Sequence, residues 1–187
     1  HPDDEIMFFY PTIKNIIKEN NIHLICLSNG NYEKQGNIRE KELYLLCKNI
    51  GINYLTINNF KDNIKKFWDT NKIESFINSY IKENNIDTII TFDDKGISYH
   101  PNHISCYFGI QNIKDIDIFI LESLYLYRKY LSIFDIINIE DNEIIFYNFN
   151  IFEVYYYMIH HLSQMKWYRF FFILLSRYSY YNTLKKL

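Results

Sequence analysis

The chain opens with a cluster of ionisable side chains, the sequence HPDDE at residues 1–5. One histidine and three carboxylates lie just before a stretch with helical periodicity, so we expect them at a strand-to-helix junction. On such a tight turn Asp3 and Asp4 point in different directions, which lets one bind a metal ion while its neighbour stays free. A simple capping turn is the alternative, because Asp and Glu are favoured in the first turn of a helix.

A second cluster, TFDDKGISYHPNH at residues 91–103, follows a predicted strand. His100 and His103 are three residues apart at the entry to a helix, from where both can approach one centre. This spacing alone is a weak signal, since surface or core histidines often show it. Two histidines and a carboxylate with an open fourth position are, however, a known form of catalytic zinc site. A carboxylate that stays off the metal can then serve as general base.

The elements that must position these clusters alternate between strands and helices. The predicted strands are residues 22–28, 54–57, 88–92 and 118–121, and the predicted helices are residues 5–19, 37–50, 73–84 and about 102–113. Pro11 is expected to delay or kink the first helix. The pattern predicts an α/β fold, a Rossmann-like and mainly parallel sheet with helices on both faces and the active site at the carboxyl ends of the strands. We expect the first strand, and any signal peptide or anchor, to lie upstream of His1 in a longer protein.

The last third of the chain has a different character. Residues 133–139 and 143–149 are predicted strands joined by a turn at 140–142, and an aromatic helical tail follows from about residue 151. The longest apolar run of the tail, residues 170–175, is far shorter than the roughly 20 residues that cross a bilayer. A core-packing helix and an interfacial helix both remain open, the latter because Trp, Tyr, Phe and Lys or Arg together favour the headgroup layer. No linker or repeat divides the chain, which predicts one catalytic domain over residues 1–187.

Composition and charge limit the class of protein and its partners. Hydrophobic residues make up 48% of the chain, enough for a sizeable core. The net charge of −2 leaves no bulk positive field for nucleic acid, so no nucleic-acid partner is expected. The cysteines Cys26, Cys47 and Cys106 are far apart, which indicates a reducing compartment or a surface that faces the cytosol.

Four blocks in register resemble the LmbE-like (PIG-L) zinc deacetylases, and most closely the eukaryotic branch that deacetylates N-acetylglucosaminyl-phosphatidylinositol. The blocks are HPDDE, LSNGN (27–31) with GNIREKEL (36–43), TFDDKGISYHPNH, and HLSQ (161–164) with WYR (167–169) and SRY (176–178). The resemblance covers nearly the whole chain, from His1 to about Leu184. One departure is Asn102, which stands where bacterial members usually have an aspartate and matches the eukaryotic branch.

The resemblance implies that His1, Asp4 and His103 bind zinc, although sites of this kind also accept other divalent metals. It implies that Asp3 is the general base and that His100 holds the oxyanion and protonates the leaving amine. Further roles carried over from the family are substrate contacts for Asn29 and Arg39 and supporting positions around the metal ligands for Glu5, Asp93 and His161.

The implied reaction removes the acetyl group from N-acetylglucosaminyl-phosphatidylinositol, the second step of glycosylphosphatidylinositol (GPI) anchor assembly. The implied partner is a glycolipid at a membrane surface, and no organic cofactor is expected. The implied location is the endoplasmic reticulum membrane, with the catalytic domain facing the cytosol. Two alternatives stay open, a zinc deacetylase of a soluble N-acetylglucosamine conjugate and a non-catalytic metal-binding relative. Retention of Asp3 beside three metal ligands argues against the second, because a scaffold has no need of a general base.

Overall fold

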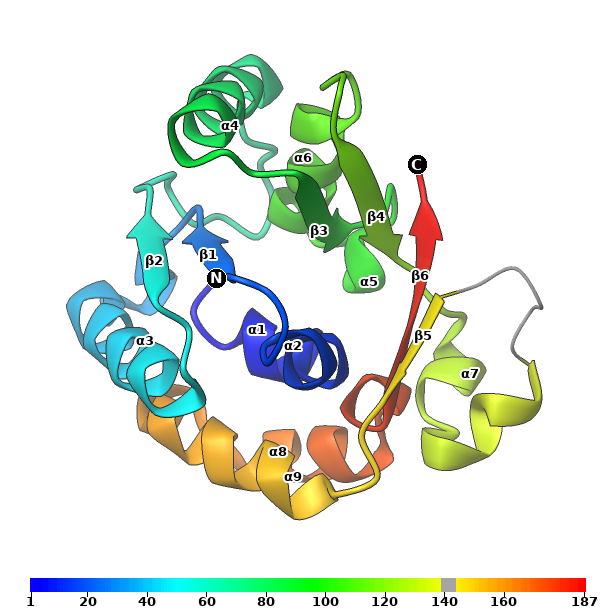
Figure 1. Cartoon of the computed structure of the whole chain (residues 1–187). Helices are drawn as coiled ribbons and strands as arrows, with labels where there is room; N and C mark the ends of the chain where they lie inside the picture. Colours follow the sequence, from blue (N-terminus) through cyan, green and yellow to red (C-terminus); the bar gives the residue numbers. More distant parts are fainter. Residues whose placement is uncertain (139–143) are drawn as a thin grey trace. The chain divides into compact units, whose positions relative to one another are not determined.

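The computed structural model describes residues 1–138 and 144–187, and they divide into two compact units (Figure 1). The first unit comprises residues 1–62, 125–138 and 145–182. The second comprises residues 63–124, 144 and 183–187. The predicted site residues are distributed over both units, so each unit is built up separately below.

A broken helix opens the first unit, as Pro11 predicts. Helix α1 (Asp4–Met7) ends before the proline, and helix α2 (Tyr10–Ile16) contains it in its first turn. Proline has no backbone N–H, and its ring would clash with the carbonyl four residues earlier. It therefore cannot continue α1, whereas the first turn of a new helix accepts it readily.

The first unit also contains a parallel strand pair connected by a helix. Strand β1 (His23–Cys26) pairs in parallel with β2 (Tyr54–Ile57), with His23 opposite Tyr54. The single turn η1 (Asn31–Glu33) and helix α3 (Gly36–Ile50) connect the two strands. Parallel pairing excludes a hairpin at the Asn-Gly sequence after β1, because a hairpin would make its strands antiparallel.

The second unit repeats the same alternation. Helix α4 (Thr70–Asn84) precedes strand β3 (Thr88–Phe92), which pairs in parallel with β4 (Asp117–Leu121). The short α5 (Gly96–Tyr99) and helix α6 (Pro101–Ile110) connect these strands. Two parallel pairs joined through helices confirm the predicted α/β, mainly parallel fold.

The carboxyl-terminal end differs from the prediction. Residues 181–184 were expected to be helical, but β6 (Tyr181–Lys186) is a strand, antiparallel to β4 in the order β3-β4-β6-β5, where β5 is Ile144–Tyr147. Asn182 explains this correction, because its Oδ1 accepts from Thr12 N at 3.1 Å and from Thr12 Oγ1 at 2.7 Å. Its Nδ2 donates to the Phe8 carbonyl at 2.8 Å. Contacts with residues this distant in the sequence override local helical preference.

The rest of the aromatic tail is helical, as predicted. Its elements are α8 (Ile151–Met158), the 3-10 helices η3 (Ile159–Gln164) and η4 (Arg177–Ser179), and α9 (Trp167–Leu175). Among the described residues, none of the helices has both the length and the apolar character that a membrane crossing requires.

A predicted strand at residues 133–139 is wrong for the part that the structure describes. Residues Ser132–Asn138 form the 3-10 helix η2, which follows helix α7 (Leu126–Lys129). The cause is the buried Asp135, whose carboxylate accepts from Arg128 Nε at 3.0 Å and from Nη2 at 3.1 Å. This two-point contact closes the chain on itself instead of extending it. Residue 139 and the predicted turn at 140–142 lie outside the described residues, whereas β5 confirms the predicted strand that follows.

Close packing in the second unit makes one glycine indispensable. A Cβ added to Gly109 in α6 would lie 2.5 Å from Cγ2 and 2.7 Å from Cβ of Ile73 in α4. Ile73 is fully buried, so it has no free space to move into. The two helices therefore approach each other at this position as closely as a hydrogen side chain allows.

We expect Gly109→Ala to lower the free energy of unfolding. Overpacking costs about 1–3 kcal/mol, which exceeds the gain of about 1 kcal/mol that alanine brings to a helix interior. Urea denaturation of the variant should show the loss, and Ser79→Ala on the exposed face of α4 is the control, expected to change little. A Gly109→Ala variant as stable as wild type would contradict the described α4–α6 contact.

Candidate functional site

Asp3 is buried and has an unusual backbone conformation. Its φ of 107° lies in the region that favours glycine, and residues held there typically cost about 1–3 kcal/mol. Two sets of hydrogen bonds hold it in place. Its N–H donates to Glu5 Oε2 at 3.0 Å, and its carbonyl accepts from the backbone of Ile6 and Met7, which starts α1. Strain of this kind persists where the surrounding structure fixes a functional side chain.

Two arginines contact the Asp3 carboxylate from distant elements. Arg39 of α3 places Nη2 at 3.4 Å from Oδ1, and Arg169 of α9 donates from Nη1 to Oδ2. Arg39 also donates to the Pro2 carbonyl at 2.6 Å and to the Gly30 carbonyl at 3.0 Å. The guanidinium groups offset the charge of a carboxylate that is almost fully removed from water. Arg169 is a partner that sequence reasoning missed, since it appeared only as a letter in the block WYR.

The loop after β1 is folded around Arg39. Gly30 has a φ of 66°, and a Cβ there would lie 2.2 Å from Arg39 Nη1, so only glycine fits. Asn29 beside it donates from Nδ2 to Glu40 Oε1 at 2.8 Å. Arg39 is buried and engaged by the loop and by Asp3, which gives it a positioning role. Substrate contact by Arg39 and Asn29 stays a prediction.

Glu5 and His161 form a buried pair that supports the same loop. His161 Nε2 lies 2.5 Å from Glu5 Oε1, and neither side chain is appreciably exposed. Burial opposes protonation, but the negative charge of Glu5 and its hydrogen bond outweigh burial and raise the pKa of His161. Ser163 fixes the turn that carries His161, because its N–H and hydroxyl donate to Glu42 at 2.8 and 2.5 Å. His161 therefore acts on Asp3 through Glu5.

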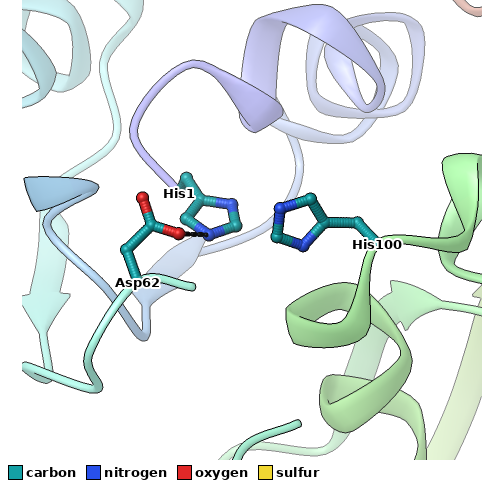
Figure 2. Close-up of side chains that lie close together, drawn as sticks. All are labelled: His1, Asp62 and His100. Carbon is teal, nitrogen blue, oxygen red and sulfur yellow. Dashed lines mark ion pairs between the residues drawn. The ribbon is translucent and has the colours of Figure 1, made fainter. Parts of the chain in front are cut away.

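His1 lies between two carboxylates, of which Figure 2 draws Asp62. Its Nε2 is 3.1 Å from Asp62 Oδ1, and its Nδ1 is 3.2 Å from Asp4 Oδ2. A neutral imidazole donates only one hydrogen, so two carboxylates at its two nitrogens call for a second proton or a metal cation. With the hydrogen on Nε2 facing Asp62, Nδ1 offers its lone pair beside Asp4. Asp62 is a second residue that sequence reasoning missed, and nothing in its local sequence marks it.

In the second unit, His103 is held in a single orientation. Its ring stacks on Phe92 at 4.0 Å between centroids, and its Nδ1 donates to the Gly96 carbonyl at 3.1 Å. This hydrogen bond places the proton on Nδ1 and leaves Nε2 as a lone-pair donor, the usual arrangement of a metal-binding histidine. Gly96 has a φ of 57°, and a Cβ there would lie 2.8 Å from the Cβ of His103.

His100, which Figure 2 also draws, is the amino-terminal cap of α6. Its Nδ1 accepts from the backbone N–H of Asn102 at 3.2 Å. An accepting Nδ1 assigns the hydrogen of the neutral ring to Nε2. His100 and His103 belong to the same helix start, and their ring centroids are 4.9 Å apart. His100 is thus prepared to donate a hydrogen, and His103 to donate an electron pair.

Asp93 organises the loop that leads to these histidines. Its Oδ1 accepts from Gly96 N at 2.9 Å and from Ser123 Oγ at 2.5 Å, and its Oδ2 accepts from Ser123 N at 2.7 Å. Ser123 Oγ in turn accepts from Ile97 N at 2.6 Å. Asp93 therefore ties the end of β3 to the segment after β4 and fixes the carbonyl that orients His103.

The two units group the predicted residues in a consistent way. The first unit brings together His1, Asp3, Asp4, Glu5, Arg39 and His161, and the second unit brings together Asp93, His100 and His103. Asn29 lies on the loop that surrounds Arg39 and contacts Glu40 instead of the carboxylate cluster.

Comparison with known sequences identifies relatives over nearly the whole chain. Residues 1–114 match the family model described as PIG-L, GlcNAc-PI de-N-acetylase. A Dictyostelium discoideum protein named "Probable N-acetylglucosaminyl-phosphatidylinositol de-N-acetylase" is 37% identical, and the alignment covers 98% of this chain and 89% of that protein. The Bos taurus N-acetylglucosaminyl-phosphatidylinositol de-N-acetylase is 33% identical over 98% of this chain and 79% of its own length.

Solved structures share the fold. N,N'-diacetylchitobiose deacetylase from Pyrococcus horikoshii superposes with a TM-score of 0.71 at 15% identity, covering 100% of this chain and 80% of that one. A deacetylase of the teicoplanin biosynthetic pathway gives 0.70 at 13% identity, covering 100% and 95%. These similarities confirm the predicted LmbE-like fold class.

The Glu5–His161 pair generates a pH-dependent prediction. A raised pKa means that the folded state binds the His161 proton more tightly than the unfolded state. The resulting stabilisation is fully present below about pH 6.5, the ordinary value of histidine, and is lost as pH rises through the raised pKa. We expect His161→Gln to cost about 3 kcal/mol near pH 6 and progressively less at higher pH.

Denaturant titrations of wild type and variant from about pH 5 upward measure this difference, starting above the ordinary pKa of glutamate. A double-mutant cycle with Glu5→Gln separates the pair from the rest of the fold. A cost of His161→Gln that does not change with pH would show that the pair carries no charge.

Proposed function

Because the chain belongs to the PIG-L family of GlcNAc-PI de-N-acetylases, we propose that it hydrolyses the acetamide of N-acetylglucosaminyl-phosphatidylinositol. The products are glucosaminyl-phosphatidylinositol and acetate, and the reaction is the second step of GPI-anchor assembly. The observation that carries this conclusion is the alignment with relatives of that name over 98% of the chain. The contacts around Asp3, His100 and His103 supply groups for each proton transfer that amide hydrolysis requires.

The proposed metal ligands are His1 and Asp4 of the first unit and His103 of the second. Their donor atoms suit the role, since Nδ1 of His1 lies beside Asp4 and Nε2 of His103 is left as a lone-pair donor. Two imidazole nitrogens and one carboxylate oxygen match the three-ligand set of catalytic zinc sites. Zinc is the proposed ion. When bound, it polarises the acetamide carbonyl and lowers the pKa of a coordinated water.

Asp3 is the proposed general base. Its carboxylate is fixed by Arg39 and Arg169 and by the strained backbone that Glu5 supports. It accepts a proton from the water that attacks the acetamide carbon, so the new carbon–oxygen bond forms without release of a free proton. The arginines position the base and compensate the charge of its buried carboxylate.

His100 is the proposed proton donor. Because its Nδ1 accepts from Asn102 N, its Nε2–H is available to the carbonyl oxygen as negative charge develops there. The same nitrogen then passes its proton to the glucosamine nitrogen as the carbon–nitrogen bond breaks, and the proton that Asp3 accepted from the water restores the hydrogen on His100. Acetate and the protonated amine account for all atoms of the amide and the water.

Assignment to GPI-anchor assembly associates the protein with the endoplasmic reticulum, and we propose that its catalytic residues face the cytosol. None of the three cysteines is in a disulfide, and Cys26 and Cys47 are buried. Burial raises the pKa of the Cys26 thiol to about 11 and that of Cys47 to about 12, so both stay protonated and unreactive. Free cysteines are typical of the reducing side of the membrane.

We expect the purified chain, loaded with zinc, to release acetate from N-acetylglucosaminyl-phosphatidylinositol in detergent micelles. A soluble N-acetylglucosamine conjugate without acyl chains is the comparison substrate, and its kcat/KM should be lower. Acetate release from the soluble conjugate alone would favour the soluble-substrate alternative. Zinc binding with no acetate release from either substrate would favour a non-catalytic relative.

Substitutions should separate the metal ligands from the base. We expect His1→Ala, Asp4→Ala and His103→Ala each to lose most bound zinc, because three protein ligands leave none to spare. Asp3→Asn should keep the metal and lower kcat by about 10²–10⁴-fold, the usual contribution of a general base. The exposed Asp94→Asn is the matched control for activity. Metal analysis that finds Asp3→Asn empty and Asp4→Ala loaded would reverse the two assignments.

A further inference from the structure

Helix α9 presents apolar side chains on both of its faces. Its inward positions, Arg169, Phe172 and Ile173, recur at the spacing of one helical face. Its outward positions are almost as apolar and are exposed: Trp167, Tyr168, Phe170, Phe171, Leu174 and Leu175, which we call the α9 surface. Trp167 is 75% exposed and Phe171 58%, values that a solvated helix face rarely shows for such residues.

Charge is distributed unevenly around this helix. From Val154 to Leu187 the sequence has no Asp or Glu, although the chain as a whole contains more acidic than basic residues. The same stretch has five Lys or Arg residues. Four of them are ion-paired with acidic side chains elsewhere in the chain, and the fifth, Lys166, is exposed directly before Trp167. A surface of this composition is complementary to a layer that carries negative charge at its edge and is apolar beneath it.

We propose that the α9 surface docks in the headgroup layer of an anionic phospholipid membrane. Nine residues give α9 a length of about 14 Å, less than half of a hydrocarbon core of about 30 Å, so it lies along the interface. Trp167 and Tyr168 beside Lys166 form the kind of end that anchors a helix at headgroup level. This inference rests on the proposed function, because an enzyme for a phosphatidylinositol glycolipid must work where the acyl chains are held.

A protein partner would fit the α9 surface less well than a bilayer does. Protein interfaces surround their apolar centre with polar side chains that hydrogen-bond across the rim. The outward positions of α9 offer only the Tyr168 hydroxyl and the Trp167 indole N–H as polar groups, and the hydroxyl also hydrogen-bonds Arg169. The headgroup layer accepts both, and the aliphatic and phenyl side chains enter the acyl region beneath it.

The same turn of α9 connects this surface to the candidate base. Arg169 lies between the exposed Tyr168 and Phe170, yet its guanidinium points inward to the Asp3 carboxylate. Helix α8 lies beside α9 (Figure 1) and supports this geometry. Its Tyr155 Oη donates to the Phe170 carbonyl at 2.7 Å. Docking of α9 therefore holds a positioning residue of the base at the surface where the substrate resides.

Intrinsic fluorescence provides a direct test, because the chain has only two tryptophans. In a Trp68→Phe background, the emission of Trp167 should shift to the blue when vesicles of phosphatidylcholine with phosphatidylinositol are added. Lipids brominated near the headgroup should quench it more strongly than lipids brominated near the acyl terminus. Unchanged emission in the presence of these vesicles would overturn the proposal. The vesicles contain no N-acetylglucosaminyl lipid, so a chain without deacetylase activity could still bind them, and the two proposals fail separately.

Substitution locates the contact. In sedimentation with the same vesicles, Phe171→Ser with Leu174→Ser should lower the partition coefficient at least about tenfold, the loss expected for two large apolar side chains. Tyr44→Ser with Leu45→Ser, on an exposed apolar face of α3 in the same unit, is the matched control and should bind like wild type. Circular dichroism melts confirm that both variants fold.

Equal vesicle binding by both double variants would place the membrane contact elsewhere and overturn the proposal. Analytical ultracentrifugation of the wild type tests whether a second copy of the chain, instead of a membrane, covers the α9 surface. A dimer that dissociates in Phe171→Ser with Leu174→Ser, without vesicle binding by the wild type, would show that a second copy of the chain covers the α9 surface.

Discussion

Two carboxylates, Asp3 and Glu5, are buried two residues apart, and the first unit is organised around compensating their charge. Removing an ion from water costs several kcal/mol unless a partner of opposite charge is placed against it. Arg39, Arg169 and His161 are those partners, and they come from α3, α9 and η3. The positions of these three elements around the amino-terminal loop therefore follow from an electrostatic requirement as much as from apolar packing.

The second unit also contains a buried carboxylate, and its charge is compensated in a simpler way. Asp93 receives its compensation from backbone N–H groups and from Ser123, so no distant cation is needed. Its hydrogen bonds set the Gly96 carbonyl, which sets the ring of His103. One carboxylate thus determines the orientation of a histidine it does not touch. The two units use opposite strategies, ion pairs in one and a hydrogen-bonded loop in the other, and both hold a functional side chain rigid.

Local signals in the sequence predict the elements that local forces determine. The break at Pro11 and the strands β2 and β3 follow from steric restriction and apolar periodicity. The strand β6 cannot be predicted in this way, because the hydrogen bond between Asn182 and Thr12 fixes its start. No local stretch of sequence contains both residues. The site shows the same division. Clusters and family blocks indicated the ionisable groups, but the pairing of Arg169 with Asp3 and of Asp62 with His1 depends on how distant segments fold together.

The span of the pairs around Asp3 has a consequence for the order of folding. Asp3 and Arg169 are 166 residues apart, and Glu5 and His161 are 156 apart. During synthesis Asp3 and Glu5 therefore leave the ribosome well over a hundred residues before these partners do. Contacts of such long sequence separation also carry the largest loop-closure cost, so they form late in folding. Synthesis of α9 is thus a checkpoint, and a polypeptide that lacks this helix cannot assemble an orientated base.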